Sequence, residues 1–222
     1  MFHVEQSQSD RDKFTEHFKN VPRGTFLKLD RYAELLAEWN GKFNLVAEST
    51  IPHIWNRHFL DSAQLMEYIP KGSKTLADMG SGAGFPGLVL SIMGFPETHL
   101  IESTGKKVNF LRAVIDEFKL NAIVHQERVE NMRDLRVDIV TARALKSLPE
   151  LLKLAQNLTK QSATCLFLKG QNAVVELTES QKSWTFSCDK RPSLSDPSGS
   201  VLILRDIKYK HAASRRKNSQ RN

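Results

Sequence analysis

The sequence predicts a doubly wound α/β fold, with a mostly parallel sheet and a helical cap before it. Strand-like and helix-like segments alternate from residue 74 onward, and short loops join them. A turn with four glycines in eight positions, Gly80 to Gly87, stands between the first strand-like segment and an apolar helix. Nucleotide-binding α/β units begin in this way. With 222 residues, the chain is long enough for one well-cored domain and an appendage.

The N-terminal part of the sequence is predicted to be helical. Residues 1–22 are polar and are expected to be frayed. Apolar side chains recur at steps of three and four over 26–43, which predicts an amphipathic helix. A second helix is expected over 53–69, and the turn residues Pro70 to Ser73 that follow are expected to end it. Residues 1–72 are therefore expected to form a cap on the domain that follows.

Residues 73–207 supply the alternating part of the fold. The expected strands are 74–79, 99–102, 122–125, 138–141, 164–168, 184–188 and 200–204. Helices are expected at 87–94, 104–119, 147–158 and 171–182. The last two strands have only loop residues between them, from Pro192 to Gly199. An antiparallel pair can be joined by such a short connection, so the sheet is predicted to finish with an antiparallel last strand.

The net charge of +7 is concentrated at the C-terminus. Residues 208–222 contain no acid and six basic residues, namely Lys208, Lys210, Arg215, Arg216, Lys217 and Arg221. This segment is expected to be a disordered basic tail, which either binds a polyanion such as nucleic acid or only aids solubility. The longest apolar runs are too short to cross a bilayer, and the N-terminus lacks the apolar core of a signal peptide. A cytoplasmic protein without membrane contact is therefore expected.

Candidate site residues follow the first five strands, at the edge where ligands bind in such sheets. In chain order they are Asp78, Gly80, Gly82, Gly84 and Phe85 after the first strand, Glu102 after the second, Val129 and Glu130 after the third, Arg143 after the fourth, and Lys169 after the fifth. The acid that precedes the glycines favours S-adenosylmethionine (SAM) over a dinucleotide as the ligand.

Each acid among them has a candidate role. Glu102 lies 22 residues past Gly80, where a carboxylate can accept both ribose hydroxyls of a nucleoside. Asp78 is placed either to hold the amino group of the ligand or to brace the loop through backbone N–H groups. Glu130 is placed to read the adenine edge while Val129 packs on the ring; the alternative is a solvated loop acid.

The cations have two interpretations as well. Arg143 and Lys169 stand at strand ends, where they either position an RNA phosphate or base or form surface ion pairs. His58 and Asp61 share one helix face. They are expected to hydrogen-bond within the interface between cap and domain, with contact to RNA or to the SAM loop as the alternative.

A dinucleotide enzyme is the main rival interpretation. Gly82, Gly84 and Gly87 satisfy the dinucleotide fingerprint, and Glu102 lies 20 residues past Gly82. Pro86 argues against it, because a proline offers no N–H to a pyrophosphate at the start of the helix. SAM carries no phosphate, so this loss matters little for SAM.

Several stretches of the chain resemble one family. They are Asp78 to Gly87, Glu102 to Arg112, Thr141 to Ala144 and Leu168 to Gly170, and upstream Trp39 to Leu45 and Arg57 to Ser62. This set is similar to the bacterial 16S ribosomal RNA guanine-N7 methyltransferases, the glucose-inhibited division protein B family, over roughly residues 26–207. Glu102 stands where many members carry Asp, which keeps the carboxylate.

The resemblance implies a Rossmann-like class I SAM-dependent methyltransferase. It implies SAM binding at Gly80, Phe85, Val129, Glu130 and Arg143. It also implies that the substrate is a guanine in the 530 loop of 16S rRNA, in the small ribosomal subunit. Two alternatives stay open, a SAM-dependent methyltransferase acting on another RNA and a non-catalytic ribosome-binding factor. Nothing in the sequence indicates an obligate interface, so a monomer is expected.

The residues agree with N7 chemistry. Guanine N7 carries an in-plane lone pair and no proton, so its methylation needs alignment and no general base. The sequence lacks the Asn/Asp-Pro-Pro-aromatic motif of amino-group methylation, and no cysteine stands where cytosine C5 chemistry needs a nucleophile. Arg143 and Lys169 are therefore expected to position the substrate, with no metal in the site.

Overall fold

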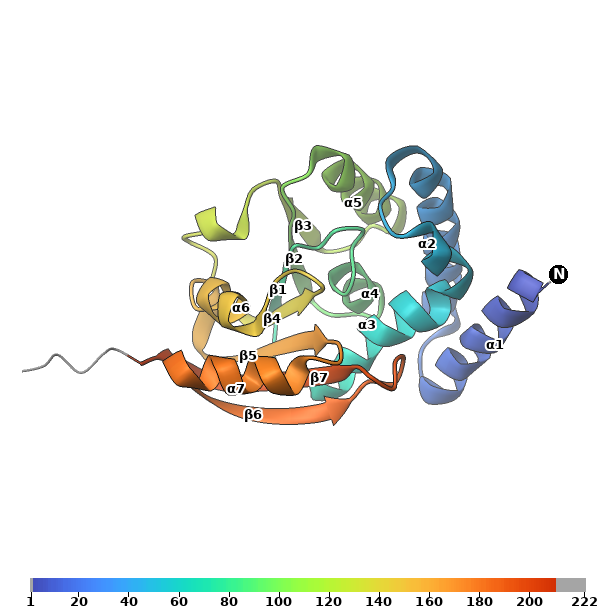
Figure 1. Ribbon diagram of the computed structural model, residues 1–222. Coiled ribbons are helices and arrows are strands. Elements are labelled where there is room, and N and C mark those ends of the chain that lie inside the picture. Colours follow the sequence, from blue (N-terminus) through green and yellow to red (C-terminus); the bar gives the residue numbers. More distant parts are fainter. Residues whose placement is uncertain (1, 211–222) are drawn as a thin grey trace, which may run out of the picture.

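The protein is described by a computed structural model that covers residues 2–210, with side chains from residue 8 onward. In this part of the chain one seven-stranded sheet forms the centre of the molecule (Figure 1). Its strands are β1 (Thr75–Met79), β2 (Glu97–Ile101), β3 (Ala122–His125), β4 (Val137–Arg143), β5 (Thr159–Lys169), β6 (Trp184–Pro192) and β7 (Ser200–Tyr209). The strand order is β3-β2-β1-β4-β5-β7-β6.

The sheet is parallel except at one end, where β7 runs antiparallel to both β5 and β6. This confirms the predicted doubly wound, mostly parallel sheet with an antiparallel last strand. The order reverses between β1 and β4, so the ends of these two strands flank the position where ligands bind in open α/β sheets.

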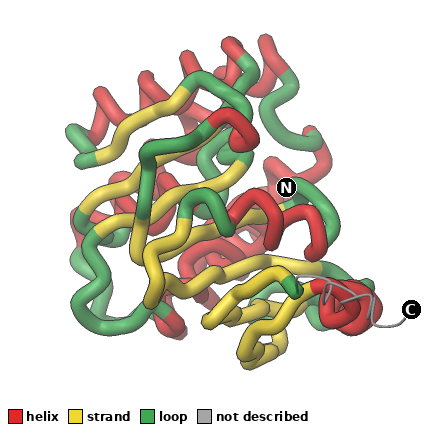
Figure 2. Tube along the Cα trace, turned by 90° about the vertical axis from the view of Figure 1, so that its left-hand side faces the viewer, coloured by secondary structure: helices red, strands yellow, loops and turns green. Residues whose placement is uncertain are grey.

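Both faces of the sheet are covered around β1, β2 and β4, which explains why these strands are nearly continuous apolar runs, whereas β6 is mostly exposed. In β5, Cys165 and Phe167 point into one core, and Leu166 and Leu168 point into the core on the opposite face. Figure 2 shows the strands side by side with helices on both sides of them.

The helices of the alternating part lie where the sequence predicts them, with boundaries that differ by a few residues. They are α4 (Gly87–Ile92), α5 (Gly105–Phe118), α6 (Leu148–Ala155) and α7 (Ala173–Ser183), with a short 3-10 turn η4 (Val129–Asn131) after β3. Buried side chains of α4 and α5 share one core with the N-terminal segments. Buried side chains of α6 and α7 belong to the core on the other face of the sheet.

The N-terminal segment differs from the prediction. Instead of being frayed, it forms helix α1 (Phe2–His17), which lies outside α2 (Arg23–Phe43) in Figure 1. The side chain of Phe14 is fully buried, and its ring is in edge contact with the rings of Phe26 and Trp55. The helix is mostly polar, but this aromatic cluster holds it against the cap.

The segment after α2 is also less regular than the single helix predicted over 53–69. It consists of η1 (Glu48–His53), η2 (Trp55–Leu60), α3 (Asp61–Ala63) and η3 (Gln64–Tyr68), of 3-10, π, α and 3-10 type. Ile54 and Leu65 are buried. Buried polar groups, among them His58, Ser62 and Gln64, accompany this irregular winding.

The C-terminal boundary is two residues later than predicted. Strand β7 continues to Tyr209, so Lys208 belongs to the sheet and not to a tail. The remainder of the predicted basic tail, residues 211–222, lies outside the described residues. The core around α2 also includes side chains of α4 and α5, which lie beyond the predicted boundary at residue 72, and the division into cap and domain stays a prediction.

Candidate active site

The glycine-rich loop between β1 and α4 is held by the cap. Tyr32 of α2 is fully buried and donates its hydroxyl hydrogen to the carbonyl of Ala83. The Tyr32 ring stacks on Phe85, with ring centroids 5.5 Å apart. Gly84 has a φ of +96°, and a Cβ added there would lie 2.6 Å from the Tyr32 hydroxyl. Only glycine suits that position, because any side chain would displace the tyrosine.

Asp78 of β1 holds this loop in place through hydrogen bonds. The side chain is fully buried; Oδ1 accepts the Thr141 hydroxyl hydrogen at 2.8 Å, and Oδ2 accepts the backbone N–H of Gly87 at 3.1 Å. Burial raises the pKa of Asp78 to about 6, although these hydrogen bonds favour the charged form. Of its two predicted roles, the contacts favour bracing. Because the Gly87 amide is bonded within the protein, it is not available to a pyrophosphate.

Glu102 follows β2 and faces the same loop. Its Oε2 accepts the N–H of Gly82 at 3.0 Å, and its Oε1 accepts the N–H of Thr104 at 2.7 Å. A Cβ added at Gly82 would meet only a backbone carbonyl, 3.9 Å away. The loop surface is thus open beside a carboxylate of fixed orientation, which fits a nucleoside with two ribose hydroxyls.

Val129 and Glu130 lie on the 3-10 turn η4 after β3. Val129 is buried in the core that also contains Ile101 of β2, whereas Glu130 is exposed. Their positions allow the predicted pair of a ring contact and an adenine-reading acid, and both roles stay predictions.

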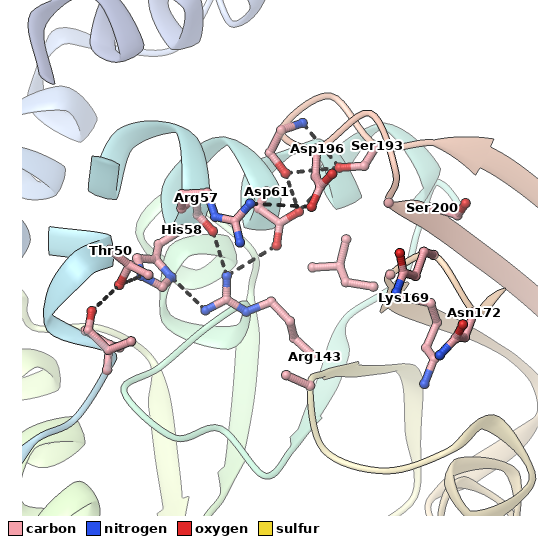
Figure 3. A pocket seen from close by; sticks show the side chains of 18 of the residues that line it. Thr50, Arg57, His58, Asp61, Arg143, Lys169, Asn172, Ser193, Asp196 and Ser200 are labelled. Carbon is pink, nitrogen blue, oxygen red and sulfur yellow. Dashed lines mark hydrogen bonds and ion pairs between the residues drawn. The ribbon is translucent and has the colours of Figure 1, made fainter. Parts of the chain in front are cut away.

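Arg143 ends β4 and is engaged by the cap. Its Nη1 donates to the carbonyl of Arg57 at 2.9 Å and to Asp61 Oδ2 at 3.2 Å, and its Nη2 donates to His58 Nδ1 at 2.8 Å (Figure 3). The guanidinium carbon lies 5.0 Å from the centre of the Phe85 ring. Arg143 therefore joins the glycine-rich loop, the end of β4 and the cap.

His58 is neutral in this arrangement. Its ring stacks on Phe85 with centroids 4.6 Å apart, and its Nε2 is 2.8 Å from Thr50 Oγ1. Burial, and then the charges of Arg143 and Arg57, lower the pKa of His58 to about 3. Nδ1 accepts from Arg143, so Nε2 carries the proton and donates to Thr50. Both ring nitrogens are occupied, as expected for a hydrogen-bonded residue between cap and domain.

Lys169 ends β5 and is paired within the protein. Its Nζ lies 2.7 Å from Glu176 Oε2 and donates to the carbonyl of Lys146 at 2.9 Å. The same Glu176 oxygen accepts the N–H of Leu148 at 2.6 Å. Lys169 therefore forms an ion pair, which is largely buried, with side chains 11% and 21% exposed, and its role toward RNA stays a prediction.

A cavity of about 540 Å³ lies between these two cations. The cap lines it with Thr50, Arg57, His58 and Asp61, the strand ends with Arg143 and Lys169, and the loop between β6 and β7 with Ser193, Ser195 and Asp196. Figure 3 shows Arg143 and Asp61 on one side of it and Lys169 and Asn172 on the other. Glu102, Gly82, Val129 and Glu130 do not line this cavity.

The predicted site residues therefore form two neighbouring groups. Asp78, the glycines and Glu102 lie at the ends of β1 and β2, with Val129 and Glu130 after β3. The cavity lies at the ends of β4 and β5, and Arg143 both lines it and contacts Phe85 of the glycine-rich loop. Sequence reasoning missed Tyr32, Glu176 and Ser195. In the sequence, Tyr32 is one of the apolar residues of the predicted helix over 26–43, with no sign of a contact to the loop. Glu176 lies one turn into the helix after Lys169, and this spacing could have indicated an ion pair. Ser195 lies in a loop, where the sequence gives no signal.

Comparisons with known proteins decide the family. The model of the family described as rRNA small subunit methyltransferase G matches residues 26–199. The chain belongs to the rRNA small subunit methyltransferase G family. Ribosomal RNA small subunit methyltransferase G of Rhodospirillum centenum is 49% identical over 84% of this chain and 87% of that protein. The protein of the same name from Paramagnetospirillum magneticum is 46% identical over 84% of this chain and 91% of that protein.

Solved structures agree on the fold. A SAM dependent methyltransferase from Aquifex aeolicus superposes with a TM-score of 0.52 at 17% identity, over 65% of this chain and 89% of that one. The ribosomal protein L11 methylase from Lactobacillus delbrueckii gives 0.53 at 14% identity, over 68% and 77%. The predicted class I methyltransferase fold is confirmed. Together, the family and the fold also confirm that the protein is a methyltransferase with SAM as co-substrate. The alternative interpretation as a dinucleotide enzyme is therefore wrong.

Two further features concern the described residues only. Within residues 2–210, no group of three or more His, Cys, Asp or Glu side chains is arranged to hold a metal ion. No helix in that range combines the length and apolar character that a membrane span requires.

Proposed function

We propose that this protein transfers the methyl group of SAM to N7 of a guanine in the 530 loop of 16S rRNA. The observation that carries the proposal is the pairing of an open, acid-flanked glycine loop with a cavity at the next two strand ends. Arg143 stands where the two meet. Membership of the rRNA small subunit methyltransferase G family supports the RNA substrate.

In this proposal SAM is held at the ends of β1 to β4. Gly80, Gly82, Gly84 and Phe85 form the loop, Glu102 accepts the ribose hydroxyls, and Val129 and Glu130 contact the adenine. Asp78 holds the loop through Gly87. When bound, SAM supplies an electrophilic methyl group. Arg143 borders both SAM and the cavity, where it and Lys169 orient the RNA.

The state of the one histidine that lines the cavity in the described chain agrees with N7 as the acceptor. His58 is the neutral imidazole that lines it, and hydrogen bonds occupy both of its ring nitrogens. Attack by guanine N7 needs no proton removal, so alignment of the base with the methyl group suffices.

The substrate is proposed to be the small ribosomal subunit or a precursor of it, met by a monomer in the cytoplasm. The test uses small subunits from a strain that lacks the gene. They are incubated with the purified protein and methyl-labelled SAM, and the 16S rRNA is digested and analysed by mass spectrometry. Label in 7-methylguanosine from the 530 loop is expected. SAM binding without any label in rRNA would overturn the proposal in favour of a ribosome-binding factor or another acceptor.

A further inference from the structure

The charges around the cavity are balanced. The cations that line it in the described chain each face a carboxylate, in the pairs Arg57–Asp196 at 3.4 Å, Arg143–Asp61 at 3.2 Å and Lys169–Glu176 at 2.7 Å. His58 adds no charge, because its pKa is lowered to about 3. A phosphate needs cations that are not already paired. This cavity suits an uncharged group that offers both hydrogen-bond donors and acceptors, such as a nucleobase.

Glu176 lines that cavity, and only one of its two carboxylate oxygens is engaged within the described residues. Its Oε2 is held by Lys169 Nζ at 2.7 Å and by the Leu148 N–H at 2.6 Å, which fix the position of the carboxylate. Its Oε1 has no hydrogen-bond partner within the described residues, and the side chain is 21% exposed. A carboxylate oxygen accepts two hydrogen bonds or more, so Oε1 retains its full capacity for a ligand.

Lys169 places a donor beside this acceptor. Its ammonium group has three N–H bonds, of which one points to Glu176 and one to the carbonyl of Lys146. The third is free to donate to a ligand. One wall of the cavity thus combines a free acceptor and a free donor on two groups whose nitrogen and oxygen are 2.7 Å apart.

On this basis, and resting on the proposed function, we infer that Glu176 and Lys169 read the Watson–Crick edge of the target guanine. Glu176 Oε1 accepts from guanine N1–H and the 2-amino group, and Lys169 Nζ donates to O6. Adenine has an acceptor at N1 and a donor at position 6, so it opposes both side chains. The pair is therefore a specificity determinant, and the guanine must be unpaired when it enters the cavity.

The same carboxylate favours the methyl transfer. The N7 lone pair forms the new bond to the methyl carbon while the carbon–sulfur bond breaks, and its electron pair stays on sulfur. The purine ring gains one positive charge and the sulfonium becomes a neutral thioether. A negative charge at the N1–H edge stabilises the ring charge as it develops, and this contribution grows toward the transition state.

The test compares two variants of α7. Glu176→Gln keeps a carbonyl oxygen for Leu148 and Lys169 but replaces the open acceptor with an N–H₂ donor. Glu179→Gln is the matched control, because Glu179 lies on the same helix in an exposed pair with Lys182. With subunits from the deletion strain, E176Q is expected to lower kcat/KM for the subunit about 10- to 100-fold. The Kd for SAM should match that of the wild type, whereas the urea midpoint should fall, because the largely buried Lys169 loses its counter-charge. E179Q should match the wild type throughout.

A second measurement changes the RNA and leaves the protein intact. Subunits are reconstituted with inosine, which lacks the 2-amino group, at the methylated position. The wild type is expected to lose about 5-fold or more in kcat/KM on them, because one bond to a charged acceptor is missing. Equal rates on inosine and guanine, or a fully active E176Q, would overturn the inference. A wild type that methylates no guanine would instead overturn the proposed function.

Discussion

Tyr32 is the residue through which the cap acts on the cofactor loop. It is fully buried, donates to the Ala83 carbonyl and stacks on Phe85, and Gly84 leaves just enough room for its hydroxyl. Burial raises the pKa of Tyr32 well above its ordinary value, so the hydroxyl stays protonated and remains a donor. The shape of the SAM loop therefore depends on a side chain from a helix about fifty residues upstream.

Tyr32→Phe is expected to weaken SAM binding. The ring remains, but the carbonyl of Ala83 loses its donor in a buried place, which costs about 1–3 kcal/mol. A loss of roughly 5- to 100-fold in SAM affinity by calorimetry is expected if the loop relaxes in response. Tyr68→Phe is the control, because Tyr68 is far less buried. SAM affinity unchanged in Tyr32→Phe would show that the loop holds its shape without the cap.

Asp78 gives the site a pH dependence whose sign is opposite to that of a salt-bridged acid. Its pKa rises from 3.8 unfolded to about 6 folded, because the buried charge is poorly solvated. Between these values the folded protein binds more protons, so the free energy of unfolding falls as pH rises, by about 3 kcal/mol in all. Urea unfolding of the wild type and Asp78→Asn at about pH 4 and pH 7 measures this. The free energy of unfolding of Asp78→Asn, relative to that of the wild type, should increase from pH 4 to pH 7. The same relative value at both pH values would contradict the raised pKa.

At the scale of elements, the loop between β6 and β7 is tied to the cap by Asp61. Its Oδ1 accepts from Ser195 Oγ at 2.6 Å and from Gln64 Nε2 at 3.1 Å, while its Oδ2 accepts from Arg143. Leu194 N–H donates to Gln64 Oε1 at 2.9 Å. One wall of the cavity is thus built from three segments that are distant in sequence.

Asp61→Ala is expected to release this loop. Four donors, on Gln64, Arg143, Ser193 and Ser195, lose a partly buried acceptor, so the free energy of unfolding should fall by about 2–4 kcal/mol. Amide hydrogen exchange over 193–199 should speed up, because the loop loses its anchor. Asp189→Ala, which breaks an exposed pair with Arg191, should change stability by less than about 1 kcal/mol. Unchanged exchange over 193–199 in Asp61→Ala would show that other contacts hold the loop.

The strands and the helices between them could be predicted, because each is marked by the spacing of apolar residues within its own segment. The first glycine, the acids and the cations at strand ends follow from the same pattern. Helix α1 escaped prediction because few apolar side chains mark it, and Phe14 finds its partners Phe26 and Trp55 far along the chain. The irregular helical segment from Glu48 to Tyr68 was not predicted, because it is accompanied by buried polar contacts such as that of Gln64 with Leu194. Such contacts leave no periodic pattern in the sequence.

At the scale of the whole molecule, basic residues outside the cavity are available for the RNA backbone. The cavity charges are paired, so phosphate contacts must lie elsewhere, and the C-terminal segment is the densest basic run. Deleting residues 211–222 removes four basic side chains. The slope of log affinity against log salt for the subunit should become shallower by about 0.7–0.9 for each lost phosphate contact. An identical slope would mean that this segment only contributes solvated charge.

The central claim is that SAM binds at the glycine-rich loop and the guanine binds in the cavity at the ends of β4 and β5. A crystal structure with S-adenosylhomocysteine bound tests it most directly. The product is expected over Gly82, with its ribose on Glu102 and its adenine beside Val129, and the cavity between Asp61 and Lys169 should stay open. Density for the product inside that cavity, with Glu102 still bonded only to Gly82 and Thr104, would contradict this claim and the guanine site built on it.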